Sequence, residues 1–222
     1  VLATSNFDRR LDDWLGRQFG ASPTDENLAF ARERGFGVLA VNGDAAPMLS
    51  HIPFLVSQDG NIADLHLVRS NPISRVLRQG ELPASIAVSG PDSYISPDWY
   101  GIEDQVPTWN YVAVHLISIH QRSLDAKLPD LLERLSVFFE ERLTPKPVWY
   151  QSKVDPVALS RMMRMIQPFR FTITDVQGTW KLNQNKPDAV RLAAADHVAA
   201  YGIGSEPRIL AAMMQTPIRK NS

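Results

Sequence analysis

The chain has 222 residues, with 23 basic and 24 acidic side chains and a formal net charge of −1. Hydrophobic residues make up 44% and charged residues 21% of it, as in a globular protein, which excludes a disordered or fibrous chain. The balanced charge argues against a nucleic-acid binder driven by electrostatics, because neutralising phosphates requires a basic surface. Without cysteine the chain has no disulfide, no thiolate metal site and no cysteine nucleophile.

The expected cellular compartment of the protein is inferred from three features that the sequence lacks: a membrane span, a signal peptide and cysteine. Its apolar stretches are interrupted by charges or prolines and fall well below the roughly 20 residues that a membrane span requires. No basic start followed by an apolar run and a small-residue cleavage site is visible. The absence of cysteine fits a reducing compartment. We therefore expect a soluble cytoplasmic protein.

Helices are predicted at the start of the chain. The segment 7–15 places apolar residues at helical spacing and predicts a short amphipathic helix or arm. A second helix begins at Ser22-Pro23-Thr24, ends at Gly35 and buries Leu28, Phe30 and Ala31. We expect residues 1–35 to form an N-terminal helical arm.

Six strands are predicted after Gly35, with turns at Asn42-Gly43-Asp44 and Asp59-Gly60. The strand segments are 36–41, 48–56, 62–68, 86–89, 110–119 and 169–174. Helices are predicted at 72–79, 128–141 and 156–166. The tail is helical from Asp188, broken near Gly202-Ile203-Gly204, and helical again over 206–214.

These elements predict a mainly β protein with peripheral helices, of the α+β class. A small six-stranded antiparallel barrel is the simplest architecture, because closure removes the exposed edges of a sheet. The expected domains are the arm at 1–35, the barrel with inserted helices at 36–186, and helices packed on the barrel at 187–222.

The common catalytic and metal motifs are absent. The sequence has no phosphate loop of the Walker type, nucleophile elbow, His-Glu-x-x-His or dinucleotide fingerprint. His115 and His120 are five residues apart and would face opposite sides of a continuous strand, so they do not form a metal pair. No convincing acid–base pair is present, and neither a catalytic residue nor a metal ligand is assigned.

Two short polar segments are candidates for binding. Arg69-Ser70-Asn71 precedes a predicted helix, with Asn71 as N-cap, and places a cation and a hydroxyl beside unpaired N–H groups. This arrangement suits a phosphate monoester; a plain helix cap with a solvated arginine explains it equally well. His51, in the second strand, is the other candidate, although a lone histidine there is more often structural.

A block rich in aromatic residues is the strongest candidate. Five large aromatic residues lie between Tyr94 and Tyr111, interleaved with hydroxyl and amide groups, which would suit a flat heteroaromatic ligand. An aromatic core cluster is the competing explanation. The amide-rich loop 180–186 is either a turn or a source of donors for a polar ligand edge.

The same segments carry a resemblance to a known family. They are 90–100, 106–111, 113–115, His51-Ile52-Pro53, 67–72 and 181–185. Together they resemble the PaiB-like family of FMN-binding split-barrel proteins, in the family's order from about Gly35 to Lys186.

The resemblance implies a six-stranded split barrel that forms a homodimer and holds FMN in a groove between the subunits. The implied cofactor-binding residues are His51, Arg69, Ser70, Asn71, Tyr94, Ser96, Trp99, Trp109, Asn110, Tyr111, Lys181, Gln184 and Asn185. Arg69, Ser70 and Asn71 would contact the phosphate, and His51 would reach the ring or brace the barrel.

The resemblance leaves three functions open. The first is an FMN-dependent oxidoreductase, of the flavin reductase kind, with NADH or NADPH as donor. The second is a negative transcriptional regulator in which the barrel is a sensor or interaction module; direct nucleic-acid binding is not favoured, because no helix-turn-helix is visible. The third is a structural relative that has lost the flavin.

Overall fold

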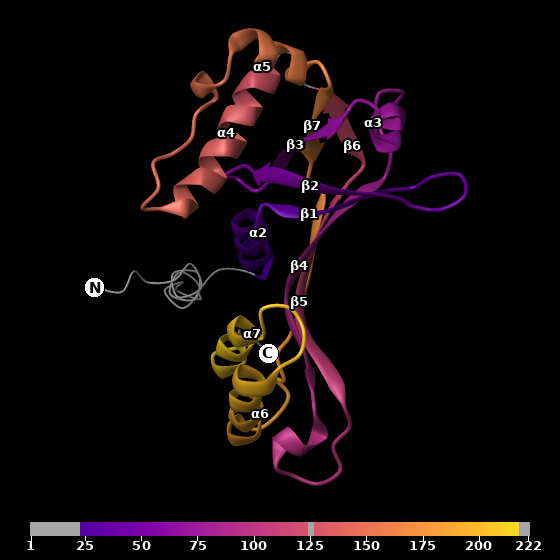
Figure 1. The fold of residues 1–222 in the computed structure, drawn as a ribbon. Helices are drawn as coiled ribbons and strands as arrows, with labels where there is room; N and C mark the ends of the chain where they lie inside the picture. The colour runs from indigo at the N-terminus through magenta and orange to yellow at the C-terminus, as the bar shows by residue number, and fades with distance from the viewer. Residues whose placement is uncertain (1–22, 124–126, 218–222) are drawn as a thin grey trace. The chain divides into compact units, whose positions relative to one another are not determined.

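The computed structural model describes residues 23–123 and 127–217 (Figure 1). The amphipathic segment expected at 7–15 lies outside the described residues. The strands form one eight-stranded sheet in the order β6-β7-β3-β2-β1-β4-β5-β8. The pairs β1–β2, β1–β4, β2–β3, β3–β7 and β6–β7 are antiparallel.

The strands are β1 (Phe36–Val41), β2 (Met48–Val56), β3 (Ile62–Val68), β4 (Ala84–Ile95), β5 (Thr108–Ser118), β6 (His120–Ser123), β7 (Ile166–Thr172) and β8 (Asp175–Lys181). The α-helices are α2 (Pro23–Arg34), α3 (Pro72–Leu77), α4 (Leu128–Glu140), α5 (Pro156–Met163), α6 (Asp188–Tyr201) and α7 (Pro207–Gln215). Short 3₁₀ turns are η1 (Pro97–Tyr100), η3 (Glu141–Leu143) and η4 (Gln151–Lys153).

The predicted fold class, a mainly antiparallel sheet with peripheral helices, is confirmed, but the sheet has eight strands and not six. β6 is a short polar segment, and β8 contains no buried residue, so neither carries a hydrophobic pattern. β4 also does not end before Gly90-Pro91 but continues to Ile95. Pro91 withdraws one N–H group from the ladder without ending the strand.

The chain divides into two compact units, each assembled from separate segments. We call the described residues 89–114 and 178–217 the hairpin unit, and residues 23–88 and 115–177 the sheet unit. The boundaries predicted at 35/36 and 186/187 follow the chain, whereas these units do not. The division into three domains at 1–35, 36–186 and 187–222 therefore stays a prediction.

The core of the sheet unit comes from alternation along β1 and the end of β2 and from buried runs in β3 and β7. Every second residue of β1 and of the segment 52–56 is buried, and the largest fully buried side chains include Phe54, Phe169 and Phe171. Burying such a side chain contributes about 1.5–3 kcal/mol each. α2 adds Phe30 and Ala31 to this core, and Arg32 Nη2 donates to the Ser57 carbonyl over 2.8 Å.

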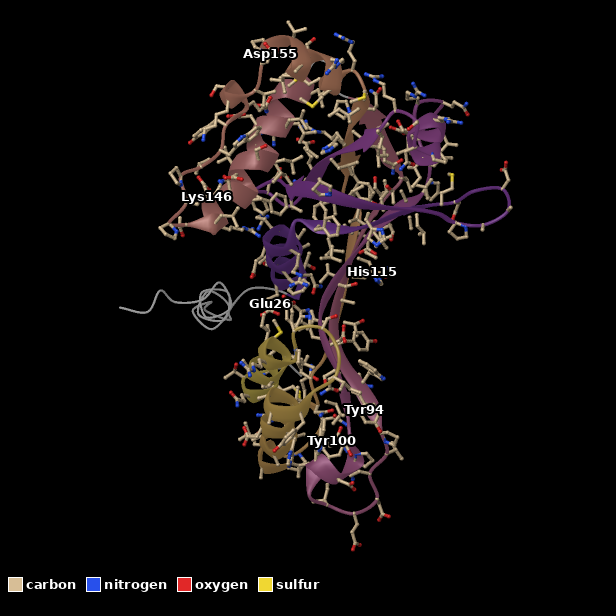
Figure 2. The ribbon with its side chains drawn as sticks, viewed as in Figure 1. Glu26, Tyr94, Tyr100, His115, Lys146 and Asp155 are labelled. Atoms are coloured by element: carbon tan, nitrogen blue, oxygen red, sulfur yellow. The ribbon has the colours of Figure 1, made fainter. Side chains whose placement is uncertain are left out.

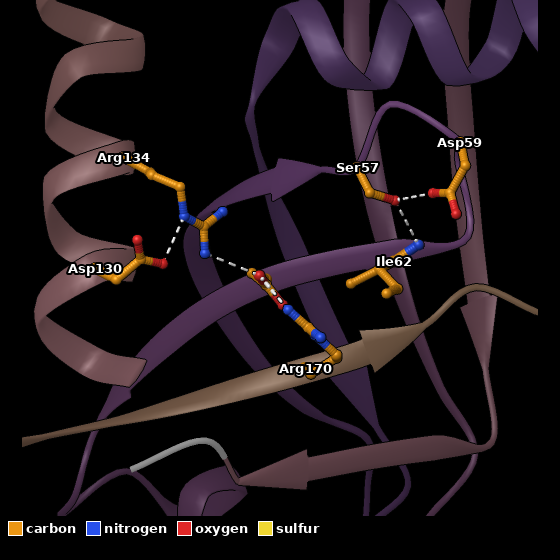
Figure 3. A network of polar contacts seen from close by, with 7 residues as sticks. Ser57, Asp59, Ile62, Asp130, Arg134 and Arg170 are labelled. Carbon is orange, nitrogen blue, oxygen red and sulfur yellow. Dashed lines mark hydrogen bonds and ion pairs between the residues drawn. The ribbon is translucent and has the colours of Figure 1, made fainter. Parts of the chain in front are cut away.

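Within the sheet unit, a buried carboxylate joins β3 and β7 to α4. Asp64 on β3 accepts from Arg170 Nε over 2.8 Å and from Arg134 Nη2 on α4 over 3.1 Å. Arg134 also pairs with Asp130 one helical turn away (Figure 3). Burial alone would raise the pKa of Asp64, but the hydrogen bonds and charges of the two arginines outweigh it and lower that pKa below its usual 3.8.

In the hairpin unit, α6 and α7 pack through a buried arginine. Arg191 Nε donates to the Met214 carbonyl over 2.7 Å, and its Nη1 pairs with Asp188. The chain between the two helices lies along β4, where the N–H of Asp92 donates to Ser205 and the N–H of Tyr94 donates to Ile203. Gly204, at φ +143°, permits this approach, because a Cβ there would collide with the Asp92 carbonyl.

Within the described residues, every helix is too short or too polar to cross a membrane.

Asp64→Asn is expected to lower the free energy of unfolding at pH 7 by about 2 kcal/mol, because two charge-assisted hydrogen bonds are weakened. The folded-state pKa of Asp64 lies below the unfolded value, so this contribution is present above pH 3.8 and is lost as the pH falls through and below it. Urea unfolding of wild type and variant between pH 7 and pH 3 should therefore show a shrinking difference.

The matched control is Asp130→Asn, which removes an exposed partner of Arg134 and should cost about 0.5 kcal/mol. A wild-type-to-variant difference that stayed constant over this pH range would contradict the role given to Asp64.

Candidate functional site

The thirteen residues implied by the resemblance fall into both units. The sheet unit holds His51, Arg69, Ser70 and Asn71. The hairpin unit holds the other nine, namely Tyr94, Ser96, Trp99, Trp109, Asn110, Tyr111, Lys181, Gln184 and Asn185. The geometry of each group is described within its own unit.

In the sheet unit, Asn71 is the N-cap of α3, as predicted. Its Oδ1 accepts from the Ile73 N–H over 2.9 Å, and its Nδ2 donates to Ser50 Oγ over 3.0 Å. The second bond fixes the start of α3 to β2, next to His51 in the chain. The Asn71 amide is thus used by the local structure, and α3 spans only six residues.

Arg69 and Ser70 carry the groups of this set that suit an anion. Arg69 is half-buried; its Nη1 donates to Gln167 Oε1, and its backbone N–H donates to Met165 over 2.8 Å. Ser70 is exposed. His51 is also exposed and stacks on Phe36, with the ring centroids 6.3 Å apart. A guanidinium beside a hydroxyl is a suitable donor set for a phosphate.

In the hairpin unit, β5 separates the predicted residues onto two faces. Trp109 and Tyr111 lie on one face and are 47% and 37% exposed. Asn110 lies on the other face, fully buried, where its Nδ2 contacts Met214 Sδ at 3.5 Å and its Oδ1 has no partner. Because neighbouring side chains of a strand point to opposite faces, this geometry gives no support to a contact between Asn110 and a ring held at Trp109 and Tyr111. That contact stays a prediction.

Tyr94 and Lys181 both contact the start of β5. The Tyr94 ring meets Trp109 edge to face at 6.2 Å, and Tyr94 comes from the part of β4 that leads to η1 and Tyr100 (Figure 2). Lys181 Nζ donates to Thr108 Oγ1, next to Trp109 in the chain. The structure therefore brings Tyr94 and Trp109 into ring contact, and it ties Lys181 to the first residue of β5.

Gln184 and Asn185 follow in the loop after β8. Gln184 closes this loop on itself: its Oε1 accepts from the Leu182 N–H over 2.8 Å, and its Nε2 donates to the Trp180 carbonyl. Asn185 is exposed. Gln184 thus shapes the loop that carries Lys181 and Asn185.

Ser96 and Trp99 lie at η1. Ser96 occupies the N-cap position, without a side-chain cap hydrogen bond. Trp99 stacks on His197 of α6 at 5.8 Å with an interplanar angle of 17°, and His197 lies 6.3 Å from the Tyr201 ring. His197 is exposed, as expected from the sequence, but it belongs to an aromatic ladder that the sequence did not indicate.

The sequence also missed a polar cluster behind η1. The Tyr100 hydroxyl donates to Asn183 Oδ1 over 3.3 Å, and Lys186 Nζ lies 5.0 Å from the Tyr100 ring centre. Burial raises the pKa of Tyr100. Asn183 has a left-handed backbone at φ 61° and a buried Nδ2 without a partner. Asparagine in a turn-rich loop was the available signal, because it tolerates this conformation better than most residues.

The described part of the chain contains no group of three or more histidine, aspartate or glutamate side chains that could hold a metal ion.

Comparison with solved structures defines the class of protein. The fold resembles the FAD and heme binding protein from Mycobacterium smegmatis, with a TM-score of 0.53, 14% identity, and coverage of 83% of this chain and 81% of that one. It also resembles the conserved hypothetical protein Rv2991 from Mycobacterium tuberculosis, with a TM-score of 0.51 and 16% identity. That match covers 77% of this chain and 94% of the other one. The antiparallel sheet with peripheral helices is thus a fold that this chain shares with these two proteins.

The family is identified by sequence. Residues 14–175 match the model described as "Putative FMN-binding domain", and the chain therefore belongs to this FMN-binding family. It is similar to the Protease synthase and sporulation protein PAI 2 of Bacillus subtilis (strain 168), with 29% identity over 177 residues, 78% of this chain and 83% of the relative. The PaiB-like resemblance is confirmed, and the cofactor is FMN.

The residues present fit this cofactor. A half-exposed indole is unusual, since tryptophan is highly buried on average, and Trp109 with Tyr111 offers π surface to a flat ring. Arg69 and Ser70 offer donors to a phosphate, and Lys181 offers a cation at the start of β5, where its Nζ donates to Thr108 Oγ1.

Trp109→Ala and Lys181→Ala are each expected to weaken FMN binding, by about tenfold and about threefold, because one loses stacking surface and the other a charge-assisted donor. Quenching of FMN fluorescence on titration with protein measures both. Trp149→Ala, which removes an indole from the sheet unit, is the matched control and should leave the affinity unchanged. Unchanged affinity in both test variants would refute the assignment of these two residues.

Proposed function

We propose that this protein is an FMN-dependent oxidoreductase of the flavin reductase kind, which takes electrons from NADH or NADPH. When bound, FMN supplies the hydride and electron chemistry. The observation that carries the proposal is the exposed aromatic pair Trp109 and Tyr111 on one face of β5, in a chain of an FMN-binding family.

The protein's part is to bind and orient. Trp109 and Tyr111 present their rings to the flat part of the cofactor, and Tyr94 supports Trp109 edge to face. Arg69 and Ser70 hold the phosphate, with Arg69 kept in place by its bond to Gln167. Lys181 sets a positive charge near the ring edge and favours extra electron density there. The sequence offers no convincing proton donor, which agrees with redox chemistry at the cofactor itself.

We propose that the protein acts as a homodimer. One face of β1 and β2 supports this: Phe36 and Leu49 are 52% and 65% exposed, and the cross-strand partners on the same face include Val38 opposite His51. Contiguous exposed apolar side chains on a sheet face are typical of surfaces that another chain covers.

The visible spectrum of the purified protein tests the function. After addition of FMN we expect bound-flavin bands, which NADH or NADPH bleaches under anaerobic conditions and air restores. The control is free FMN with the same donor, which reacts far more slowly. Bound flavin that neither donor reduces faster than free FMN would refute the oxidoreductase proposal.

Arg69→Gln tests the phosphate role separately from the ring. Affinity for FMN should fall about tenfold or more, whereas affinity for riboflavin, which has no phosphate, should be unchanged. Fluorescence titrations with the two flavins measure both values. An equal loss for FMN and riboflavin would contradict a phosphate contact and indicate a structural effect.

A regulatory role is the second candidate, and the name of the relative, a protease synthase and sporulation protein, favours it. A salt-dependent shift of promoter DNA at physiological ionic strength, without reduction of bound flavin by a nicotinamide, would support this function over the first.

A further inference from the structure

The charges of this nearly neutral chain are separated along its length. The segment 89–114, which forms the hairpin of β4, η1 and β5, contains four acidic residues and no basic one. Three of the four, Asp98, Glu103 and Asp104, lie at the hairpin tip, which we define as residues 97–107. All three are exposed, and none is in an ion pair within the described residues.

The tip is apolar as well as acidic. Ile102 and Val106 are 47% and 74% exposed. Lys186 reaches the tip, but it donates to Gln105 Oε1 and lies over the Tyr100 ring, and so is directed to neutral groups. The carboxylates of the tip therefore remain available to a cationic partner.

The sheet unit carries the opposite surface. The segments 65–80 and 156–174 contain six arginines and no acidic residue. They meet where the Arg69 N–H donates to the Met165 carbonyl and Val68 pairs with Ile166. We call residues 72–78 and 156–165 at this junction, which include α3 and α5, the arginine corner.

The arginine corner has exposed cations and exposed apolar side chains. Arg75, Arg78, Arg161 and Arg164 are exposed, and none of them is in an ion pair within the part of the chain that the structure describes. Their hydrogen bonds, where they make them, go to neutral oxygens of Ser70, Ser74 and Ser160.

α5 is a helix without a buried face. It contains no buried residue. Two of its apolar side chains are exposed, Val157 at 77% and Met162 at 43%, and Met165, which follows the helix, is 55% exposed. An amphipathic helix owes most of its stability to the packing of its apolar face, so α5 is expected to be covered by a partner.

We propose that the hairpin tip of a second copy of this chain docks on the arginine corner. The two surfaces match in charge and in kind: each combines exposed charges of one sign with exposed aliphatic or thioether side chains. In a two-fold dimer each copy supplies one tip and one corner, so two identical contacts form and the assembly closes. The inference rests on the homodimer under the proposed function and identifies how its copies recognise each other.

A second copy fits better than a nucleic acid. A nucleic acid is bound mainly through charge, whereas Val157, Met162 and Met165 on the corner call for an apolar counterpart, which Ile102 and Val106 of the tip provide. Complementary charges also steer the copies toward the correct pairing and disfavour tip-to-tip contact.

Two charge-reversed variants test the docking. Glu103→Lys/Asp104→Lys reverses the tip, and Arg161→Glu/Arg164→Glu reverses the corner. Each variant alone sets like charges against each other at both contacts, so the dimer dissociation constant at low salt should rise at least about tenfold. In an equimolar mixture the two variants can form a heterodimer, in which the reversed tip meets the reversed corner and the native tip meets the native corner. Opposite charges then face each other at both contacts, so association should return to within about threefold of wild type.

Analytical ultracentrifugation at about 50 mM NaCl measures the constants, and circular dichroism checks that each variant is folded. Glu141→Lys and Arg208→Glu, which reverse exposed charges outside both surfaces and outside β1 and β2, are matched controls and should dimerise like wild type. Weakened variants whose mixture recovers support the proposal. Variants that dimerise normally would overturn the docking but leave the homodimer intact.

Three other results would also overturn the proposal. Failure of the mixture to recover would show that the charges do not meet between copies. Binding of duplex DNA or anionic lipid vesicles that the reversed corner abolishes, without change in dimerisation, would assign the corner to a different occupant. A wild-type protein that binds FMN as a monomer would refute the homodimer and with it this contact.

Discussion

The side chains of a β-strand point alternately to its two faces, and this period of two decides which residues of the aromatic block act together. On β5 it places Trp109 and Tyr111 on an exposed face and buries Asn110 against Met214 on the other. A motif that is contiguous in sequence is therefore divided between an exposed face and a buried face of the strand. The same alternation fills the interior of the sheet unit from β1 and the end of β2.

Sequence-based prediction of strands and helices was most accurate where the hydrophobic pattern was clear. The first three strands and the N-cap at Asn71 were predicted correctly, because alternation and capping are local properties. β6 and β8 could not be found, since a short polar segment and a strand without buried residues carry no pattern. The cofactor came from the family's motifs, and FMN binding was correct. The roles of Asn71 and Gln184 in local structure depend on tertiary contacts, which no spacing rule contains.

Net charge was the least informative part of the composition. A total of −1 hides an acid-only hairpin and two arginine segments without acids. Composition also does not show which charges are neighbours in the fold. The pKa of the buried Asp64 falls below its usual value only because of two arginines that are far from it in sequence. What matters for recognition and stability is the place of each charge, and the fold supplies that place.

The short segment at Ile203–Ser205, which pairs with β4, has a further consequence for the hairpin unit. An uncovered strand offers a row of backbone donors and acceptors on which foreign strands can add, and this is a common route to aggregation. Here the molecule occupies that side of β4 with its own backbone. Whatever approaches this edge must then be recognised through side chains and not through strand addition, so selectivity is retained and promiscuous polymerisation is avoided.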